Sequence, residues 1–150
     1  MRLIPIGRIH SDFKTKEDAP RQGRLVNNIS TIEIYDDYVE GINELKDMTH
    51  IIVLYWGDQS NREVIRTKTP FSTTEIGVFA TRSPNRPNPI AFCVCEVVAV
   101  FKNKIKVKYL DALDGSEVLD IKVYSAELDS YPLANSPDKK LKSNHSLPST

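Results

Sequence analysis

Alternating apolar and polar positions mark the clearest strand of this chain. In the run 104–110, lysines alternate with Ile105, Val107 and Tyr109. Because successive side chains of a strand point to opposite faces, this pattern predicts a strand with one face toward the core. The long apolar run 90–101 precedes it, and the two-residue polar link between them predicts a tight turn and a β-hairpin.

Four other runs also have the composition of strands. They are 3–10, 29–35, His50–Trp56 and 118–124. The third is apolar at nearly every position, which predicts a central strand covered on both faces. The fourth alternates through Leu119, Ile121 and Val123, and with the hairpin just described it is expected to form a three-stranded meander.

One short amphipathic helix is predicted over 36–47. Tyr38, Ile42 and Leu45 recur there at helical spacing, with acidic residues between them. Two polar segments, 11–28 and 57–75, follow neither the helical nor the strand period and are expected to be long loops. Long loops in compact domains often carry function.

The stretch 77–90 carries charge on an irregular backbone between two apolar runs. Its start, 78–80, fits a short buried strand. Three prolines then each fix φ and remove a donor, which excludes a helix or a central strand. They are Pro84, Pro87 and Pro89. The two arginines between them, Arg82 and Arg86, would project from a stiff loop, which suits binding of an anion or ligand as well as a solvated connection.

Six or seven strands and one short helix do not alternate as βαβ units, so we expect an all-β fold. An antiparallel sandwich or small β-barrel with long loops fits this inventory. The 150 residues suit one domain over 1–131, and the polar stretch 132–150 is expected to be a flexible tail. Neither a dinucleotide-binding glycine motif nor a phosphate loop is present, so those two chemistries lack their usual scaffold.

Charge and cysteine content narrow the possible partners. Lys and Arg number 20, as do Asp and Glu, so an anionic partner must be met by a local basic patch. No apolar run reaches the length of a membrane span, and a soluble, cytoplasmic protein without membrane contact is expected. Cys93 and Cys95 would share one strand face as buried free thiols. With the three histidines scattered, no metal site is expected.

Four stretches of the chain together resemble the TsaA family. They are 20–22, 45–50, 77–90, and 111–116 with the following run 118–122. The resemblance covers residues 3 to 131 in consistent order, and the proline-rich stretch is unusual enough to be highly specific. It implies a β-barrel methyltransferase that uses S-adenosylmethionine, forms a homodimer, and methylates N6 of threonylcarbamoyl-adenosine next to the anticodon of tRNA.

The resemblance also implies which residues contact the cofactor. These positions lie on loops at strand ends, on the proline-rich stretch and on the strand after it. They are Arg21, Gln22, Gly23, Asp58, Gln59, Arg82, Val94, Asp111, Leu113, Asp114 and Gly115. A carboxylate such as Asp111 or Asp114 could accept hydrogen bonds from the methionine ammonium or the ribose. For the Asp114-Gly115 pair, plain turn chemistry is an equal alternative.

Arg82 and Arg86 are assigned to substrate binding, with Arg82 shared with the cofactor. A guanidinium group suits bidentate binding of a tRNA phosphate or of the threonyl carboxylate. Arg86 would turn either outward to tRNA or inward to a structural carboxylate such as Asp120. Asp58 stands where bacterial members often have histidine, a departure that bears on the substrate rather than on cofactor binding.

No catalytic base is assigned from the sequence. His50 opens a buried strand and is expected to be a structural, hydrogen-bonded residue. Tyr55, Trp56 and Phe92 are expected in the core rather than on a base-stacking platform. Two other functions stay open: a non-catalytic sensor that binds S-adenosylmethionine or a nucleotide, and an RNA-binding barrel without a cofactor.

Overall fold

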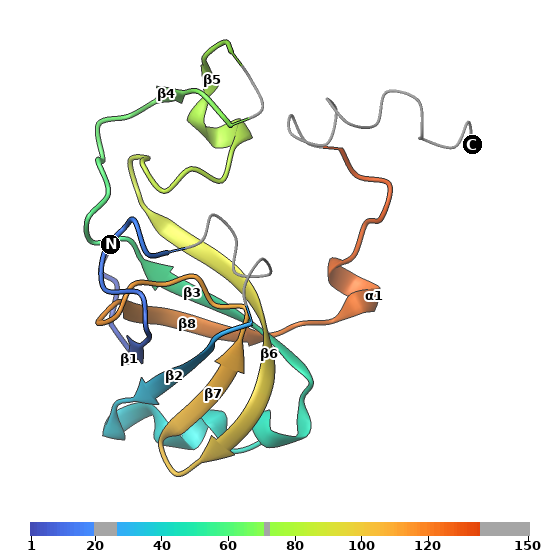
Figure 1. Cartoon of the computed structure of the whole chain (residues 1–150). Coiled ribbons are helices and arrows are strands. Elements are labelled where there is room, and N and C mark those ends of the chain that lie inside the picture. Colours follow the sequence, from blue (N-terminus) through green and yellow to red (C-terminus); the bar gives the residue numbers. More distant parts are fainter. Residues whose placement is uncertain (20–26, 71–72, 136–150) are drawn as a thin grey trace. The chain divides into compact units, whose positions relative to one another are not determined.

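Six antiparallel strands close into a barrel, which forms the first of two structural units (Figure 1). This unit comprises Met1–Asp58 and Ile90–Tyr124, and the second comprises Gln59–Pro89 and Ser125–Thr150. The computed structural model describes residues 1–19, 27–70 and 73–135. The closed antiparallel barrel confirms the predicted all-β class, and among the two arrangements considered it is the barrel that forms.

The barrel strands follow an order around the wall that differs from their order in the chain. They are β1 (Gly7–His10), β2 (Ile29–Ile34), β3 (His50–Trp56), β6 (Ile90–Phe101), β7 (Lys104–Lys108) and β8 (Glu117–Val123). Around the barrel the order is β1-β2-β7-β6-β3-β8, and β8 pairs with β1 to close it. Within the described part of the chain, closure gives every barrel strand a neighbour on both sides.

β6 is the longest strand, and its curved path in Figure 1 links two sides of the barrel. Its first half pairs with β3 and its second half with β7. The predicted hairpin of β6 and β7 is therefore confirmed. The predicted meander is wrong, because β8 pairs with β1 and β3 rather than with β7. Closing the barrel requires the chain to cross from β7 to the far side before β8 begins.

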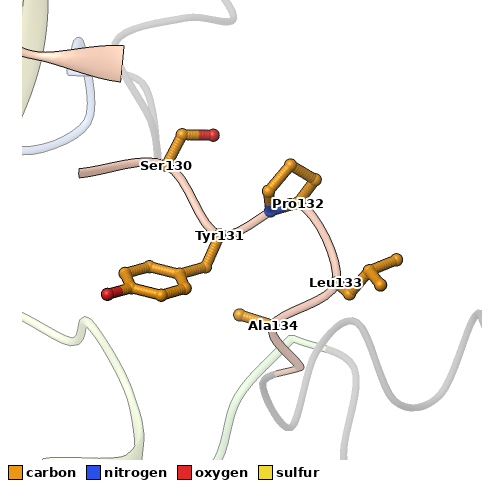
Figure 2. Close-up of a pocket in the computed structure, with 5 residues that line it drawn as sticks. All are labelled: Ser130, Tyr131, Pro132, Leu133 and Ala134. Carbon is orange, nitrogen blue, oxygen red and sulfur yellow. The ribbon is translucent and has the colours of Figure 1, made fainter. Parts of the chain in front are cut away.

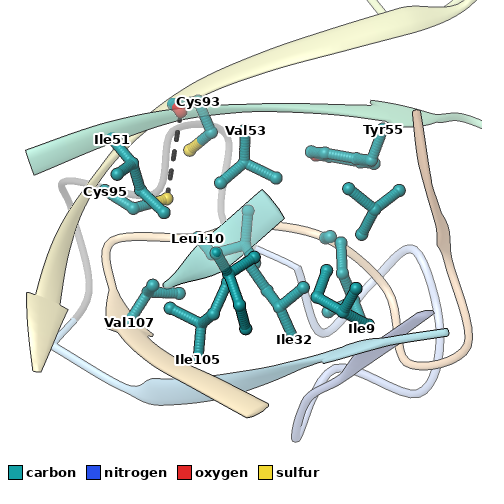
Figure 3. Packing of buried hydrophobic residues seen from close by; sticks show 14 residues of the cluster. Ile9, Ile32, Ile51, Val53, Tyr55, Cys93, Cys95, Ile105, Val107 and Leu110 are labelled. Carbon is teal, nitrogen blue, oxygen red and sulfur yellow. Dashed lines mark hydrogen bonds between the residues drawn. The ribbon is translucent and has the colours of Figure 1, made fainter. Parts of the chain in front are cut away.

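Apolar side chains from all six strands fill the barrel interior, as Figure 3 shows. Ile105 and Val107 of β7 are fully buried, as their alternation with lysines predicts. Ile51 and Val53 on the inner face are equally buried, and Ile52 between them is buried on the outer face, so both faces of β3 are covered there as predicted. Each such side chain contributes roughly 1.5 to 3 kcal/mol by leaving water, so this cluster is the main source of stability.

β1 begins at Gly7 and not at residue 3 as predicted. Pro5 has no amide hydrogen to donate to a neighbouring strand, which shortens the strand at its start. Gly7 then pairs with Ile34 of β2, and a Cβ atom at this glycine would overlap the carbonyl oxygen of Glu33. Only glycine allows so close an approach of the two backbones at this position.

The predicted amphipathic helix is wrong in type, because two short 3₁₀ helices take its place. These are η2 (Asp36–Ile42) and η3 (Leu45–Asp47). Gly41 has low helix propensity and no side chain caps the start of η2, so a continuous α-helix is not supported. Ile42 is buried as expected. The one α-helix within the described ranges, α1 (Ala126–Asp129), was not predicted and is capped by Ser125.

β8 departs from the predicted alternation because it contains a bulge. Leu54 pairs with Asp120 and Tyr55 with Val118, so Leu119 between them is an extra residue. The bulge turns Val118 toward the interior, where it is fully buried, on the same face as Ile121, which pairs with Val53. A regular period of two could not predict this change of face.

The second unit contains a two-stranded ribbon and a turn where loop and strand were predicted. β4 (Arg66–Thr67), inside the expected loop 57–75, pairs with β5 (Ile76–Gly77), which follows directly after that loop. The predicted buried strand over 78–80 is a 3₁₀ helix, η4 (Val78–Ala80), which the Thr81 hydroxyl closes by donating to the carbonyl oxygen of Val78 at 2.7 Å.

The remaining structural predictions have mixed outcomes. Cys93 and Cys95 are buried free cysteines on the inner face of β6, as expected. Tyr55 belongs to the core, but Phe92 is 45% exposed on the outer face of β6, so its core prediction is wrong. Residues 132–135 are exposed, and the rest of the predicted tail lies outside the described residues. Within the described chain, no helix has the length and apolar character of a transmembrane segment.

Candidate functional site

The connection from β7 to β8 carries four of the predicted cofactor residues. Leu110 and Ala112 of this connection are buried in the barrel core, which holds the backbone between them against the barrel. Asp111 and Leu113 alternate with these two anchors and are only half-buried. The connection is therefore a fixed platform that presents Asp111 and its neighbours.

Hydrogen bonds tie the platform to β1 and to the segment that follows it. The amide of Gly115 donates to the carbonyl oxygen of Ile9 at 2.7 Å, and the amide of Asp114 donates to that of Phe13 at 2.7 Å. The Ser11 hydroxyl donates to the carbonyl oxygen of Ala112 at 2.8 Å. Gly115 has a φ of +87°, the left-handed conformation that glycine adopts without strain. The predicted turn at Asp114-Gly115 is present.

Both carboxylate oxygens of Asp114 contact hydrogen-bond donors. Oδ1 accepts from the amide of Ser11 at 2.9 Å, and Oδ2 pairs with Nζ of Lys14, also at 2.9 Å. The Lys14 contact, followed by the Ser11 amide, lowers the pKa of Asp114 below its ordinary value. This geometry supports the turn alternative for Asp114, and its contact with a cofactor stays a prediction.

Asp111 lies beside Tyr55, and this pair is the most distinctive polar contact of the barrel unit. The Tyr55 hydroxyl donates to Oδ1 of Asp111 at 2.6 Å. Burial raises the pKa of the Asp111 carboxyl, and the hydrogen bond from Tyr55 acts against this rise. Burial, and then the nearby Asp111, raises the pKa of Tyr55, so its hydroxyl keeps its proton. One hydrogen bond leaves the carboxylate acceptor capacity for a ligand.

Cys93 helps to hold the same platform. Its Sγ atom donates to the carbonyl oxygen of Tyr109 at 2.8 Å. Tyr109 has a φ of 72°, a conformation that costs a residue other than glycine of the order of 1 kcal/mol or more. Tyr109, which directly precedes Leu110 and Asp111 in the chain, is thus a strained residue whose carbonyl oxygen is held by a side chain of β6. The same buried inner face contains Cys95, whose thiol lies 3.9 Å from the Cys93 carbonyl oxygen (Figure 3).

The structure does not bring every predicted cofactor residue of the barrel unit to Asp111. Val94 pairs with Ile52 and lies on the outer face of β6, since Cys93 and Cys95 on either side point inward. The barrel wall therefore separates the Val94 side chain from the Asp111–Tyr55 pair. Asp58 is exposed just beyond β3. Arg21, Gln22 and Gly23 lie outside the described residues.

In the second unit, Arg86 is directed into its own loop. Its guanidinium donates to the carbonyl oxygens of Ser83 and Val78 at 3.0 Å each, and to that of Thr81 at 3.2 Å. Of the two orientations considered, the inward one is present, but with backbone carbonyls in place of Asp120. Asp120 instead pairs with its neighbour Lys122 at 3.0 Å. A substrate contact by Arg86 stays a prediction.

A second arginine, Arg62, also holds the proline-rich stretch. Its Nε donates to the carbonyl oxygen of Pro87 at 2.7 Å, and its Nη2 donates to the Asn88 side chain at 3.1 Å. Arg82 is exposed on the stretch that these contacts hold, and Gln59 is exposed at the start of the unit. No site role was predicted for Arg62, Ser11 or Lys14, and Tyr55 was expected only in the core, because the residues that they hold at the site are distant in the chain.

Two surface hollows contain none of the predicted site residues. One lies in the barrel unit between η2 and β8 and has Ile34, Tyr38 and Ile42 among its lining. The other, in Figure 2, is formed by one short segment, Ser130 to Ala134, in which Tyr131 and Leu133 are 77% and 57% exposed. Among the described residues, His, Cys, Asp and Glu side chains form no group that could hold a metal ion.

Comparisons with known proteins agree with the barrel and with the resemblance. Residues 8–130 match the family model described as the tRNA-methyltransferase O N-terminal domain. An S-adenosyl-L-methionine-binding protein of Archaeoglobus fulgidus is 54% identical over 129 residues, which are 86% of this chain and 93% of that protein.

Two longer proteins match the chain over part of their own length. A human tRNA (adenine(37)-N6)-methyltransferase is 28% identical, with 97% of this chain and 35% of that protein covered. The crystal structure of TrmO from Pseudomonas aeruginosa superposes with a TM-score of 0.78 at 31% identity, over 91% of this chain and 61% of that one. By its sequence over 8–130 and by its barrel, this chain belongs to the tRNA-methyltransferase O N-terminal domain family.

Proposed function

We propose that this protein transfers a methyl group from S-adenosylmethionine to N6 of threonylcarbamoyl-adenosine next to the anticodon of tRNA. The observation that carries the proposal is the match of residues 8–130 to the tRNA-methyltransferase O family. The relative from Archaeoglobus fulgidus supports the cofactor, and the human relative supports the base and its position. A tRNA substrate is consistent with the expected cytoplasmic location.

The Asp111–Tyr55 pair fits the donor groups of the cofactor. S-adenosylmethionine offers an ammonium group and ribose hydroxyls, all of which donate hydrogen bonds to a carboxylate. Tyr55, a residue of the barrel core, fixes the orientation of Asp111 through a hydroxyl that keeps its proton. Because Asp111 is partly buried, a bond to a cationic donor is stronger there than in open water.

When bound, S-adenosylmethionine supplies a methyl group activated by its positively charged sulfur. The residues of this chain contribute binding and orientation. Asp111 holds one end of the cofactor, and the exposed Arg82 is proposed to meet the cofactor or the threonyl carboxylate of the substrate. Fixing two reactants in one geometry can supply much of the rate acceleration of a methyl transfer. Arg62 and Arg86 keep the stretch that carries Arg82 rigid.

A second function is favoured by the Archaeoglobus fulgidus relative with 54% identity, which is named as an S-adenosyl-L-methionine-binding protein and not as a transferase. In that case the chain would bind S-adenosylmethionine and signal its presence to a partner without turnover. Binding would then be the same as in the enzyme, and only transfer would be absent.

The deciding experiment incubates the full chain with methyl-labelled S-adenosylmethionine and two preparations of bulk tRNA, with and without the threonylcarbamoyl group. We expect label in the methylated form of threonylcarbamoyl-adenosine after digestion to nucleosides, and only with the modified tRNA. Calorimetric binding of the cofactor without transfer to either preparation would favour the binding protein. If the cofactor does not bind at millimolar concentration, both functions are refuted.

A further inference from the structure

Phe79 is held out into solvent by a turn that is anchored on both sides. Its neighbour Val78 is fully buried, whereas Phe79 is 78% exposed. The Val78 amide donates to the carbonyl oxygen of Ile65 at 3.0 Å, and its carbonyl oxygen accepts from the Thr81 hydroxyl and the Arg86 guanidinium. The aromatic ring therefore projects from a fixed backbone, so little conformational freedom remains to be lost when a partner binds.

The segment that carries Phe79 is basic, although the whole chain is neutral. Gln59–Pro89 has five arginine or lysine residues and two glutamates, which is a net charge of +3. The basic residues are Arg62, Arg66, Lys68, Arg82 and Arg86, and all of them except Arg86 are exposed. Arg66 pairs with Gly77, two residues before Phe79 in the chain, and its guanidinium donates to the carbonyl oxygen of Glu75 at 3.0 Å. An anionic partner suits this surface.

An exposed aromatic ring among guanidinium and ammonium groups suits RNA better than it suits a protein surface of mixed charge. Every base has a π-face that can stack on phenylalanine, and the phosphates on either side can meet arginine and lysine. Paired bases in a stem are not accessible for stacking, so the occupant must contain unpaired bases.

We propose that Phe79 is a stacking platform for an unpaired base of an RNA loop, and that the exposed Arg66 and Lys68 bind the adjacent phosphates. The identification of this RNA as the anticodon loop of tRNA rests on the proposed function. The stacking contact itself does not require that a methyl group is transferred.

The test measures binding of a fluorescent anticodon stem–loop RNA to the full chain by anisotropy, without S-adenosylmethionine. Phe79→Ala should weaken binding about 5-fold to 150-fold, which corresponds to roughly 1 to 3 kcal/mol for one stacked base. Phe79→Tyr, which keeps the ring, should bind as the wild type does. Phe79→Leu keeps an apolar side chain without a ring and should behave as the alanine variant.

Phe101→Ala is the matched control. Phe101 lies in the barrel unit, is 69% exposed and has the ammonium of Lys102 at 5.3 Å from its ring centre. It therefore combines an exposed ring with a positive charge, but outside the basic segment, and its loss should leave RNA binding unchanged. The logarithm of the RNA-binding constant falls linearly with the logarithm of the salt concentration. Lys68→Ala should make this slope less steep by about one, because one phosphate contact is lost, whereas Phe79→Ala should leave the slope unchanged.

Four results would overturn the proposal. The first is that the wild type binds no RNA, and the second is that wild type and Phe79→Ala bind RNA equally well. The third is that Phe79→Ala loses cofactor binding to the same extent as RNA binding, and the fourth is that this variant changes its oligomeric mass. The last two would assign Phe79 to the cofactor site or to a contact between copies. If the wild type binds the RNA but never methylates it, the proposed function fails and the stacking contact stands.

Discussion

At the scale of single residues, the two buried serines of the barrel unit differ in what their hydroxyls contact. The Ser11 hydroxyl donates to Ala112 and accepts from the Phe13 amide, at 2.8 Å and 3.2 Å. The Ser30 hydroxyl has no hydrogen-bond partner among the described residues, although its side chain is only 1% exposed. A buried hydroxyl without a partner keeps its full cost of desolvation.

Ser30→Ala is therefore expected to leave stability unchanged or raise the free energy of unfolding by up to about 1 kcal/mol. Ser11→Ala should lower it by about 1 to 2 kcal/mol, because it removes two bonds that hold the platform around Asp111. Urea denaturation of the two variants measures both changes. A loss of stability in Ser30→Ala as large as that in Ser11→Ala would show that the Ser30 hydroxyl has a partner.

A second prediction at this scale concerns Asp111. Its pKa is raised, so the folded protein holds this proton more tightly than the unfolded chain, and stability falls as the pH rises through the window between the two pKa values. Asp111→Asn keeps an acceptor for Tyr55 and removes the buried charge. The variant should have a higher melting temperature than the wild type at pH 7. This difference in melting temperature should shrink as the pH is lowered toward about 4.

The same variant should bind S-adenosylmethionine about 10-fold to 100-fold more weakly if Asp111 holds a cationic donor. Thermal melting at both pH values and calorimetry at pH 7 check the two effects separately. Tyr55→Phe is the companion variant, since it removes the opposing hydrogen bond and should move the acid limb of cofactor binding to higher pH. Unchanged binding in both variants would exclude Asp111 from the cofactor site.

At the scale of elements, the proline-rich stretch owes its rigidity to arginine as well as to proline. Arg86 donates to three carbonyl oxygens of its own loop, so it takes the place of the regular backbone hydrogen bonds that the prolines cannot make. Arg82, on the same stretch, is exposed. The two residues therefore have different expected effects on stability.

Arg86→Ala should lower the free energy of unfolding by about 2 kcal/mol and increase protease cleavage between residues 78 and 89, because partly buried carbonyls lose a charged donor. Arg82→Ala should cost less stability than Arg86→Ala, because its side chain is exposed, and should weaken cofactor binding. Thermal melting, limited proteolysis and calorimetry on both variants separate these effects. Equal melting temperatures would show that the three carbonyl contacts do not hold the loop.

At the scale of the whole molecule, the outer face of β6 exposes several large apolar side chains. Ile90, Phe92 and Val98 are 41%, 45% and 43% exposed. Ile90 and Phe92 lie two residues apart on this strand face, and exposed large apolar side chains that lie together can belong to an interface. We propose that the protein is a homodimer, as the family resemblance implies, and that this face of β6 takes part in the contact.

Light scattering should then give twice the chain mass of 17.0 kDa. Phe92→Lys should shift the protein toward the monomer, since a charge would be buried in the contact. Lys106→Glu, on the outer face of β7, changes charge on a surface that is already polar and should leave the mass unchanged. A monomeric wild type that still transfers methyl groups would refute the idea that two chains are needed.

The sequence by itself determined those features that depend on neighbouring residues. Alternation in β7 predicted the burial of Ile105 and Val107, the two-residue spacing of the cysteines predicted their common inner face, and Asp114-Gly115 predicted a turn. Family membership was also readable, because the proline-rich stretch is long and locally distinctive. These properties follow from strand period, turn geometry and φ restrictions, which act over a few residues.

Only the tertiary structure decided which distant residues meet. Tyr55 meets Asp111 across 56 positions and Ser11 meets Asp114 across 103, because closing the barrel brings β8 to β1 and the β7–β8 connection to the end of β1. Periodicity cannot predict such pairings, since it specifies a face of a strand and not the neighbour of that strand. Likewise, Phe79 reads as core by its apolar character, and only the anchoring of Val78 shows that it is exposed.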